Sequence, residues 1–420
     1  MPKPQLLVIS AVLPVPRRAG QNARVYNKLR SFRTRFEVTF LSFAPVAQHA
    51  ELVPKLNELV DHLILLPAYS QANLLTRLWH RGRGLLFTLR TGLKMSNYLI
   101  GQVELAPDRV VDACADRSFD VVVYEYWHTV ETVTLFQSQA VPCVIDMHNV
   151  LWQSYVRLLN DQQLPDWWRQ RQIARYKAAE EQAWGRFDGL ITINSAEHAY
   201  VEKLLPNKQL FYAPMGIDMH EWAYQWTPQT PPRVGYYGGL GTAHNQANAL
   251  FCYEKVMPIV WQQFPDAELW LVGSNPPAHL RQLSERDHRV VVTGFVEDIQ
   301  ATLKTLTVAL CPWHGRYGFR SRLIELMAVG APTVATSDAV YGMDFVDGDG
   351  LFMCDSAEAM AEITQMLLAD PAVAQRHSDA ARRQVVDRYD FVSTYDSLTD
   401  GLLQLVEQSG ERHEAGRYLA

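Results

Sequence analysis

The chain has 420 residues, of which 48% are hydrophobic and 20% are charged, and its formal net charge is −6. This is the composition of a globular protein large enough for two domains, and the negative balance gives no support to a nucleic-acid-binding role for the whole chain. Five scattered cysteines without a C-x-x-C pair indicate neither a zinc site nor a disulfide framework, so we expect a reducing, cytoplasmic compartment.

The N-terminal part opens with the apolar run LLVIS at residues 6–10, which predicts a buried parallel strand. Prolines break the run soon afterwards, so we interpret it as a strand and not as a signal peptide. A helix over 22–33 and a strand over 38–42 are expected next. Gly20, at the turn into that helix, is where the backbone lets a phosphate or sugar approach, although a glycine there often only shapes the loop. No apolar stretch reaches the roughly 18 residues of a membrane-spanning helix.

The segment 71–105 combines basic and apolar side chains and has no acid before Glu104. This composition is typical of a helix lying on an anionic membrane, and it also fits a pair of solvated helices with an ordinary core face. Both interpretations stay open. The basic residues are Arg77, His80, Arg81, Arg83, Arg90 and Lys94, and the apolar ones include Leu74, Leu75, Leu78, Trp79, Leu85, Leu86, Phe87 and Leu89.

Strands are predicted over 121–125 and 141–146, and the second opens into Asp146-Met-His148-Asn149. In an open α/β sheet, residues just past the carboxyl end of a strand lie where ligands bind. His148 is therefore a candidate functional residue, with a structural histidine as the alternative. The alternation continues with a helix over 167–186, a strand over 190–194, a helix over 197–204 and a strand over 210–213.

A Pro-rich stretch, WTPQTPPR at residues 226–233, breaks the periodicity and predicts an interdomain linker. After it, a strand over 234–237 leads into a glycine-rich turn with Gly238 and Gly239, and strand–helix alternation restarts. Alternation on both sides of a linker predicts two doubly wound domains. The predicted divisions are an N-terminal domain over 1–221, a linker over 222–233, a C-terminal domain over 234–390, and a C-terminal helix and tail over 391–420.

The most informative stretch is HGRYGFRSRLIELMAVGAPTVAT at residues 314–336. A buried strand ends just before it, and a short helix over 323–329 leads to the next strand. Gly318, Arg320 and Arg322 lie in the strand-to-helix turn, where free N–H groups and the helix dipole favour an anion and Arg forks match phosphate oxygens. Glu325 falls in an apolar helix, where a carboxylate needs a protein partner or a ligand's hydroxyls. Together these residues predict a site for a phosphate joined to a sugar.

A possible metal motif comes later in the chain, where Asp347 and Asp349 form a D-x-D pair. Such a pair can hold a metal–diphosphate. Here glycines flank it before the short run at 351–354, a context that favours a turn. We assign no metal site.

The pattern G-x-R-x-R-x-x-E over residues 318–325, continued by M-A-x-G-x-P, resembles the donor-binding signature of a known family. These are the retaining glycosyltransferases of the two-domain GT-B fold, in family 4, often called group 1. The pattern is most similar to that of the exopolysaccharide-associated branch, with Arg322 in place of the usual lysine. The resemblance implies an α/β protein with two doubly wound, Rossmann-like domains facing across a cleft and a C-terminal helix crossing back.

The resemblance also implies a site and its ligands. The C-terminal domain would bind a UDP- or GDP-linked sugar, with Glu325 on the ribose hydroxyls and two arginines neutralising the diphosphate in place of a metal. His148 would be the catalytic residue beside the sugar or the acceptor. The donor site as a whole would comprise Gly20, Gly238, Gly239, Gly318, Arg320, Arg322 and Glu325.

The implied activity is sugar transfer with retention of configuration to a glycan or lipid-linked acceptor, in surface polysaccharide biosynthesis. It needs no metal and no cofactor besides the nucleotide-sugar donor. The expected location is cytoplasmic, on the inner face of the cytoplasmic membrane if residues 71–105 dock there. We expect no nucleic-acid partner.

Two departures from the family pattern leave alternatives open. Tyr317 stands where much of the family has the first of two glutamates, and residues 238–248 offer no Arg or Lys. One alternative is a degenerate GT-B protein that binds nucleotide but serves as a scaffold. A nucleotide-sugar epimerase shares the fold and ranks last, because it needs acids of its own in the sugar pocket.

Overall fold

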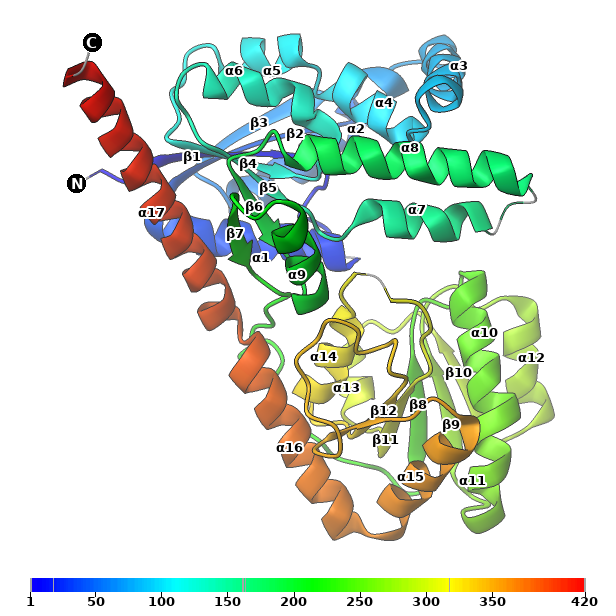
Figure 1. Cartoon of the computed structure of the whole chain (residues 1–420). Coiled ribbons are helices and arrows are strands. Elements are labelled where there is room, and N and C mark those ends of the chain that lie inside the picture. Colours follow the sequence, from blue (N-terminus) through cyan, green and yellow to red (C-terminus); the bar gives the residue numbers. More distant parts are fainter. Residues whose placement is uncertain (1, 18, 161, 163, 317, 419–420) are drawn as a thin grey trace. The chain divides into compact units, whose positions relative to one another are not determined.

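The computed structural model describes residues 2–17, 19–160, 162, 164–316 and 318–418, and it divides into two compact units (Figure 1). Unit 1 comprises Met1–Pro214 and Val392–Ala420, and unit 2 comprises Met215–Phe391. Each unit has its own parallel sheet with its own helices. Among the described residues, no helix is both long and apolar enough to cross a membrane.

Unit 1 is built on a seven-stranded parallel sheet in the order β3-β2-β1-β4-β5-β6-β7. Its central strands are almost wholly buried apolar runs, as expected for a parallel sheet with both faces covered. The strand order reverses between β1 and β4, which puts the topological switch point there. The strands are β1 (Gln5–Ser10), β2 (Glu37–Ala44), β3 (His62–Pro67), β4 (Val121–Glu125), β5 (Cys143–Asp146), β6 (Gly189–Thr192) and β7 (Gln209–Tyr212).

Helices of very different environment accompany this sheet. α1 is deeply buried, whereas α3 has a single buried residue. The helices are α1 (Gly20–Arg35), α2 (Val46–Asn57), α3 (Leu74–Thr91), α4 (Met95–Leu99), α5 (Pro107–Cys114), α6 (Val133–Gln137), α7 (Leu151–Asn160), α8 (Asp166–Trp184) and α9 (Ser195–Leu204), with short helical turns η1 (Tyr69–Gln71), η2 (Ile100–Glu104) and η3 (Trp127–Thr132).

Unit 2 repeats the arrangement with six parallel strands in the order β10-β9-β8-β11-β12-β13, so its order reverses between β8 and β11. The strands are β8 (Arg233–Tyr237), β9 (Glu268–Val272), β10 (Val290–Gly294), β11 (Val308–Cys311), β12 (Thr333–Ala335) and β13 (Leu351–Met353). The helices are α10 (Ala243–Phe251), η4 (Cys252–Val256), α11 (Met257–Gln263), α12 (Ala278–Arg286), α13 (Ile299–Leu303), α14 (Ser321–Ala328), α15 (Ala357–Ala369) and α16 (Pro371–Tyr389).

The last helix, α17 (Phe391–Tyr418), returns the chain to unit 1. The Thr399 hydroxyl lies 2.8 Å from that of Ser31 on α1. Leu398 and Leu402 are buried, and a Cβ at Gly401 would lie 2.9 Å from the Phe211 ring of β7. The part of the helix around residues 398–402 therefore packs on unit 1.

The two predicted doubly wound domains are confirmed, with local differences. Beyond the glycine turn the chain forms α10, the π-helical turn η4 and α11 in succession, and Pro258 at the start of α11 lacks the N–H that would continue the helical hydrogen bonds. The unit boundary falls after Pro214, before the predicted linker. Residues 222–233 belong to unit 2, where the Trp226 indole donates to the carbonyl of Leu306 at 2.8 Å.

Candidate functional site

Two carboxylates meet at the carboxyl edge of the unit 1 sheet. Glu125 ends β4, Asp146 ends β5, and the two positions are paired in register. Both side chains are buried. Two like charges at neighbouring positions repel each other, and burial strengthens the repulsion, so this arrangement requires positive charge close by.

Helix α1 supplies that charge from two residues one turn apart. Lys28 Nζ donates to both oxygens of Glu125, at 2.6 and 2.7 Å, and also to Asp146 Oδ2. Arg24 donates to the two oxygens of Asp146 from Nε at 2.8 Å and from Nη2 at 3.1 Å, and its Nη1 donates to the carbonyl of Ala213 at 2.8 Å. Lys28 and Arg24 are themselves buried, so the four groups form a closed charge network inside unit 1.

The network keeps both carboxylates ionised. Burial opposes the ionisation of Asp146, but Arg24 and Lys28 outweigh it and hold its pKa well below the usual range. For Glu125, burial is likewise overcome by Lys28 and by His148, and its pKa is lowered. The network therefore favours the charged form of both carboxylates.

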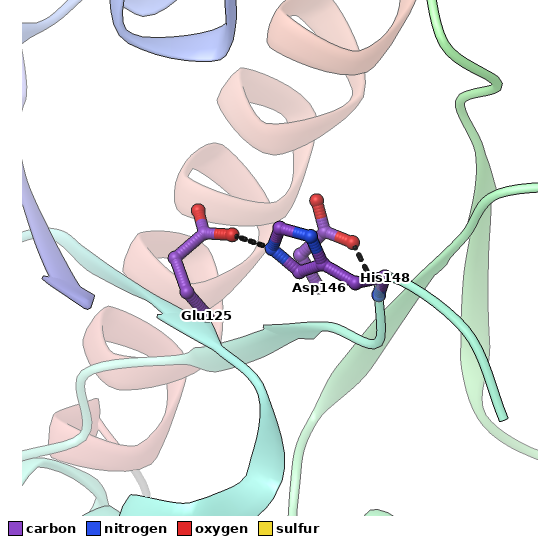
Figure 2. A group of neighbouring side chains, drawn as sticks. All are labelled: Glu125, Asp146 and His148. Atoms are coloured by element: carbon purple, nitrogen blue, oxygen red, sulfur yellow. Dashed lines mark hydrogen bonds and ion pairs between the residues drawn. The ribbon is translucent and has the colours of Figure 1, made fainter. Parts of the chain in front are cut away.

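His148 lies just past β5, and its ring points toward Glu125 (Figure 2). Its Nε2 is 2.5 Å from Glu125 Oε2, and its backbone N–H donates to Asp146 Oδ1 at 3.0 Å. An Nε2–H that donates to the carboxylate leaves Nδ1 as the ring's acceptor in the neutral tautomer. The network thus fixes both the orientation and the hydrogen-bonding sense of His148.

Strained backbone is found at the same place. His148 and Tyr126 have positive φ angles of 56° and 68°, which residues other than glycine rarely adopt. Their rings stack at 4.2 Å between centroids with 16° between planes, and the His128 ring lies 5.5 Å from that of Tyr126. Burial lowers the pKa of His128 to about 3, so its ring is neutral. Such strain persists where surroundings fix it and is concentrated at functional sites.

The spacing of Glu125, Asp146 and His148 also bears on metal binding. Their ligand atoms lie within 4.8 Å of one another, a geometry that a metal ion could bridge. In this structure the carboxylate oxygens already accept hydrogen bonds from Lys28 and Arg24. An added cation would have to displace or repel an ammonium group that touches both acids, so the donor set does not favour a metal.

In unit 2, the carboxylate of Glu325 meets a tyrosine hydroxyl. Tyr237, the last residue of β8, donates to Glu325 on α14. Burial raises the pKa of Glu325, and the Tyr237 hydrogen bond and the charge of Arg322 partly oppose that effect. The Glu325 side chain is only half-buried, so lone pairs remain for a ligand. Tyr237 is thus a protein partner of this carboxylate, one of the two kinds of partner that the sequence left open.

Arg322 lies across the end of the same strand. Its Nη1 donates to the carbonyl of Tyr237 at 3.2 Å, and its guanidinium lies 4.8 Å from the centre of the Trp313 ring. A Cβ at Gly238 would come within 2.2 Å of Nη1, so this glycine is required for the arginine to lie there. Gly239 has open space where a Cβ would be, which leaves its backbone accessible.

Arg320 has a different orientation. It is the N-cap residue of α14, and its Nη2 donates to the carbonyl of Gly315 at 2.9 Å, within its own loop. Gly318, two residues earlier, has φ of 62°, a left-handed conformation that suits glycine. Tyr317, the predicted departure from the family pattern, lies outside the described residues.

The predicted site residues therefore fall into two groups. Gly238, Arg322 and Glu325 come together at the switch point of unit 2, with Gly239, Gly318 and Arg320 on the adjoining loops. His148 and Gly20 belong to unit 1, where Gly20 begins α1 and is exposed. The Asp347–Asp349 stretch forms a turn, in which Asp347 accepts the N–H of Met353 at 2.8 Å.

Sequence reasoning missed the residues that position the side chains of each group within its own unit. Two of them carried a signal, because Arg24 and Lys28 follow helical spacing with the buried residues Val25, Leu29 and Phe32. A cation on the apolar face of a helix needs a buried acid opposite it. Glu125, Tyr126, Tyr237 and Trp313 carried no comparable signal.

One family model matches within unit 2. Residues 231–370 match "Glycosyl transferases group 1", so this stretch is a glycosyltransferase domain and the predicted enzyme class is confirmed at the level of that domain. Glycogen synthase of Mycobacterium tuberculosis is 25% identical over 212 residues, which are 48% of this chain and 50% of that protein. The chain thus spans about half the length of the curated relatives it matches.

Solved structures are similar along nearly the whole chain. Sucrose-phosphate synthase from Thermosynechococcus elongatus has a TM-score of 0.66 at 18% identity, covering 97% of this chain and 100% of that one. HepE from Anabaena with UDP-glucose has a TM-score of 0.61 at 14% identity, covering 96% and 100%. A TarM variant of S. aureus with UDP, Fondaparinux and alpha-GlcNAc-glycerol has 0.63 at 11%, covering 94% and 99%. These likenesses confirm the predicted GT-B fold.

The charge network yields a prediction for stability. Lys28→Met leaves two adjacent carboxylates buried without the cation between them, and we expect it to lower the free energy of unfolding of unit 1 by about 3–5 kcal/mol at about pH 8. The measurement is the urea midpoint by circular dichroism. Lys55→Met is the matched control, because Lys55 forms an exposed pair with Glu51 and its loss should cost no more than about 0.5 kcal/mol.

The loss should also depend on pH. In the wild type the pKa values of Glu125 and Asp146 are lower in the folded than in the unfolded state. The network therefore contributes fully to the free energy of unfolding when the pH is above the unfolded-state pKa values, and this contribution is lost as the pH falls through the folded-state pKa values. In Lys28→Met one acid must bind a proton to stay buried. The difference between variant and wild type should therefore shrink from about pH 8 to about pH 5. An equal loss at both pH values, or one no larger than in Lys55→Met, would contradict this account.

Proposed function

We propose that this protein is a retaining glycosyltransferase of family 4, of the exopolysaccharide-associated type, that uses a UDP- or GDP-linked sugar and no metal. The observation that carries the proposal is the grouping of Glu325, Arg322 and the open backbone at Gly239 at the switch point of unit 2, inside the matched domain. An acid that can bind ribose hydroxyls and a cation that can bind phosphate therefore lie close together at the end of β8.

The donor is held by groups of opposite charge. Glu325 accepts the ribose hydroxyls with the lone pairs that Tyr237 leaves, and Arg322 receives the diphosphate over the end of β8. Arg320 joins it by exchanging its hydrogen bond with the Gly315 carbonyl for phosphate oxygens, which are stronger acceptors. The open backbone at Gly239 lets the diphosphate approach the main chain.

Catalysis would come mainly from electrostatic stabilisation of the departing diphosphate. Guanidinium groups fixed before the reaction lower the cost of the charge that develops on the leaving group. Arg322 is fixed by the Tyr237 carbonyl and the Trp313 ring, so it needs little reorganisation. Two such cations would replace the metal that other transferases use, and the acids of unit 1, already neutralised by Lys28 and Arg24, are consistent with that.

His148 would act on the sugar or the acceptor. Its Nδ1 is set as an acceptor by the Nε2 contact to Glu125, and the stacked Tyr126 ring fixes its plane. A hydroxyl of the transferred sugar or of the acceptor can donate to this nitrogen. The acceptor itself would be a glycan or a lipid-linked glycan of a surface polysaccharide, with the protein in the cytoplasm or on the inner face of the cytoplasmic membrane.

The similar structures support the choice of ligands. HepE was solved with UDP-glucose, and the TarM variant with UDP and saccharide ligands. Both proteins share the fold of this chain. Nucleotide-sugar donors and glycan acceptors are therefore the ligands to test.

Nucleotide binding tests the donor site. Arg322→Ala should weaken UDP or GDP by about 10- to 150-fold, because one charge-assisted hydrogen bond contributes roughly 1.5–3 kcal/mol, and it should leave the bare nucleoside nearly unchanged. Arg320→Ala should behave in the same way. Glu325→Gln should weaken nucleoside and diphosphate alike. Isothermal titration calorimetry measures all of these affinities.

Arg316→Ala is the control, because Arg316 is an exposed arginine of the same loop that pairs with Asp338. It should bind the diphosphate like the wild type. If both phosphate-site variants bound diphosphate as tightly as Arg316→Ala does, the site would be misassigned. Tight binding without donor hydrolysis or transfer for any UDP- or GDP-sugar would instead favour the scaffold hypothesis.

Turnover tests the role of His148. His148→Ala removes one neutral hydrogen bond to the reacting partners, worth roughly 0.5–1.5 kcal/mol, so kcat should fall by about 2- to 13-fold while donor affinity changes little. Coupled detection of the released nucleoside diphosphate gives both parameters. His62→Ala, on β3 of the same unit, should match the wild type. A collapse of donor affinity with an unchanged rate per bound donor would show that His148 is not on the acceptor side.

A further inference from the structure

We propose that α3 is a membrane-docking helix, which lies flat on an anionic phospholipid surface with a leucine-rich face inserted among the lipids. This goes beyond sugar transfer and does not depend on it. The proposal rests on which face of α3 the fold leaves uncovered, and on the charges that border that face.

The inner face of α3 consists mostly of small or polar residues, with Phe87 as the exception. Only Gly84 is buried, and Thr76, His80, Phe87 and Thr88 are half-buried. These positions contact α4: His80 Nδ1 is 3.3 Å from the Tyr98 hydroxyl, and the Phe87 and Tyr98 rings are 5.6 Å apart. A Cβ at Gly84 would come within 2.6 Å of Met95, so the helix approaches α4 closely along this line.

The outer face is apolar. Seven large side chains are between 51% and 79% exposed. At about 100° per residue, they fall within a single arc of about 140° around the helix. This is the reverse of an ordinary surface helix, whose apolar stripe faces the core. The seven residues, called the leucine face below, are Leu74, Leu75, Leu78, Trp79, Leu85, Leu86 and Leu89.

Arginines border the leucine face on both sides. By the same helical spacing, Arg77 and Arg81 follow one edge, and Arg83 and Arg90 follow the other. Arginine stems can lie on apolar surface while their guanidinium groups reach phosphate oxygens. Trp79 falls at the border beside Arg83, whose guanidinium lies 5.7 Å from its ring, and tryptophan is the residue that favours the membrane interface.

The charges select a lipid surface over a protein. No Asp or Glu occurs between Asp61 and Glu104, and Glu104 is buried, whereas the chain as a whole has a net charge of −6. A second copy laid against the leucine face would bring arginine borders together, and like charges would repel. An anionic bilayer offers an apolar interior for the leucine face and phosphates for the arginines, and it does not require a partner surface of complementary shape.

The helix is also formed independently of any lipid. Asn73 caps its first turn by accepting the N–H of Thr76 at 2.8 Å, and Gly92 ends it in a left-handed conformation. Arg175 on α8 donates to the carbonyl of Arg90 near that end. The leucine face is therefore presented in a fixed orientation, and docking needs no coil-to-helix transition.

Vesicle sedimentation of the full chain tests the proposal without any nucleotide sugar. The protein should pellet with phosphatidylcholine–phosphatidylglycerol vesicles, much less with phosphatidylcholine alone, and less as salt rises. Arg81→Gln with Arg83→Gln should weaken anionic binding by about 30-fold, and Leu78→Gln with Leu85→Gln and Leu86→Gln should abolish it. The matched control is Val46→Gln with Arg117→Gln, exposed residues elsewhere on unit 1, which should bind like the wild type.

Two further measurements keep the outcomes distinct. The emission of a fluorophore attached at Leu86→Cys, in a Cys354→Ser background, should shift to the blue on anionic vesicles, whereas that of one at Arg117→Cys should not.

Size-exclusion chromatography without lipid should give the same elution volume for the wild type and for the leucine-face variant. Equal pelleting of that variant and the wild type would overturn the proposal, as would a change of oligomeric state caused by the substitutions. Transfer to a water-soluble acceptor should survive in the variant, so failure of docking and failure of the proposed activity are separable.

Discussion

The contact between Lys28 and the two acids at the ends of β4 and β5 is the constraint on which unit 1 depends. Parallel strands must bring Glu125 and Asp146 side by side, because their register is fixed by the pairing of β4 with β5. Neither acid can stay buried and charged without a cation, so α1 has to present Lys28, with Arg24 one turn away, to the end of the sheet. The position of α1, the ionisation of both acids and the orientation of His148 follow from that one requirement.

Unit 2 has the same reversal of strand order as unit 1, but the charged side chains at its switch point are arranged differently. In unit 1 the charged groups at the switch point form ion pairs with one another, and the hydrogen bond to Glu125 fixes the orientation of His148. In unit 2 the guanidinium of Arg322 donates to a main-chain carbonyl and lies over an aromatic ring, and Glu325 is the acid that acts on it, beside the two cations Arg320 and Arg322 of the same loop and helix. At the sheet edge of unit 1 the acids and cations thus neutralise one another, whereas the sheet edge of unit 2 retains positive charge for an anionic ligand. The fold permits both, and the side chains decide between them.

The sequence predicted the alternation of strands and helices, the second sheet and the stretch around Glu325, because these depend on local periodicity and on residues close together in the chain. It predicted that Glu325 needs a partner but could not identify Tyr237, which comes from a strand 88 residues earlier. Likewise, Gly238 was expected to be part of the donor site, and the structure shows in addition that its lack of a side chain makes room for Arg322. For residues 71–105 the composition left two interpretations open. The proposal that favours one of them needed the face of α3 that α4 covers, which only the tertiary structure gives.

The return of α17 to unit 1 sets the order in which the molecule can be completed. Unit 1 is encoded in two pieces, and all of unit 2 lies between them in the chain. During synthesis, which proceeds from the N-terminus, the sheet of unit 1 and all of unit 2 emerge before the helix that covers Ser31 and Phe211. Until then the surface that α17 will bury remains exposed. Unit 1 is therefore begun before unit 2 on the ribosome and completed after it, because it needs a helix that follows unit 2 in the chain.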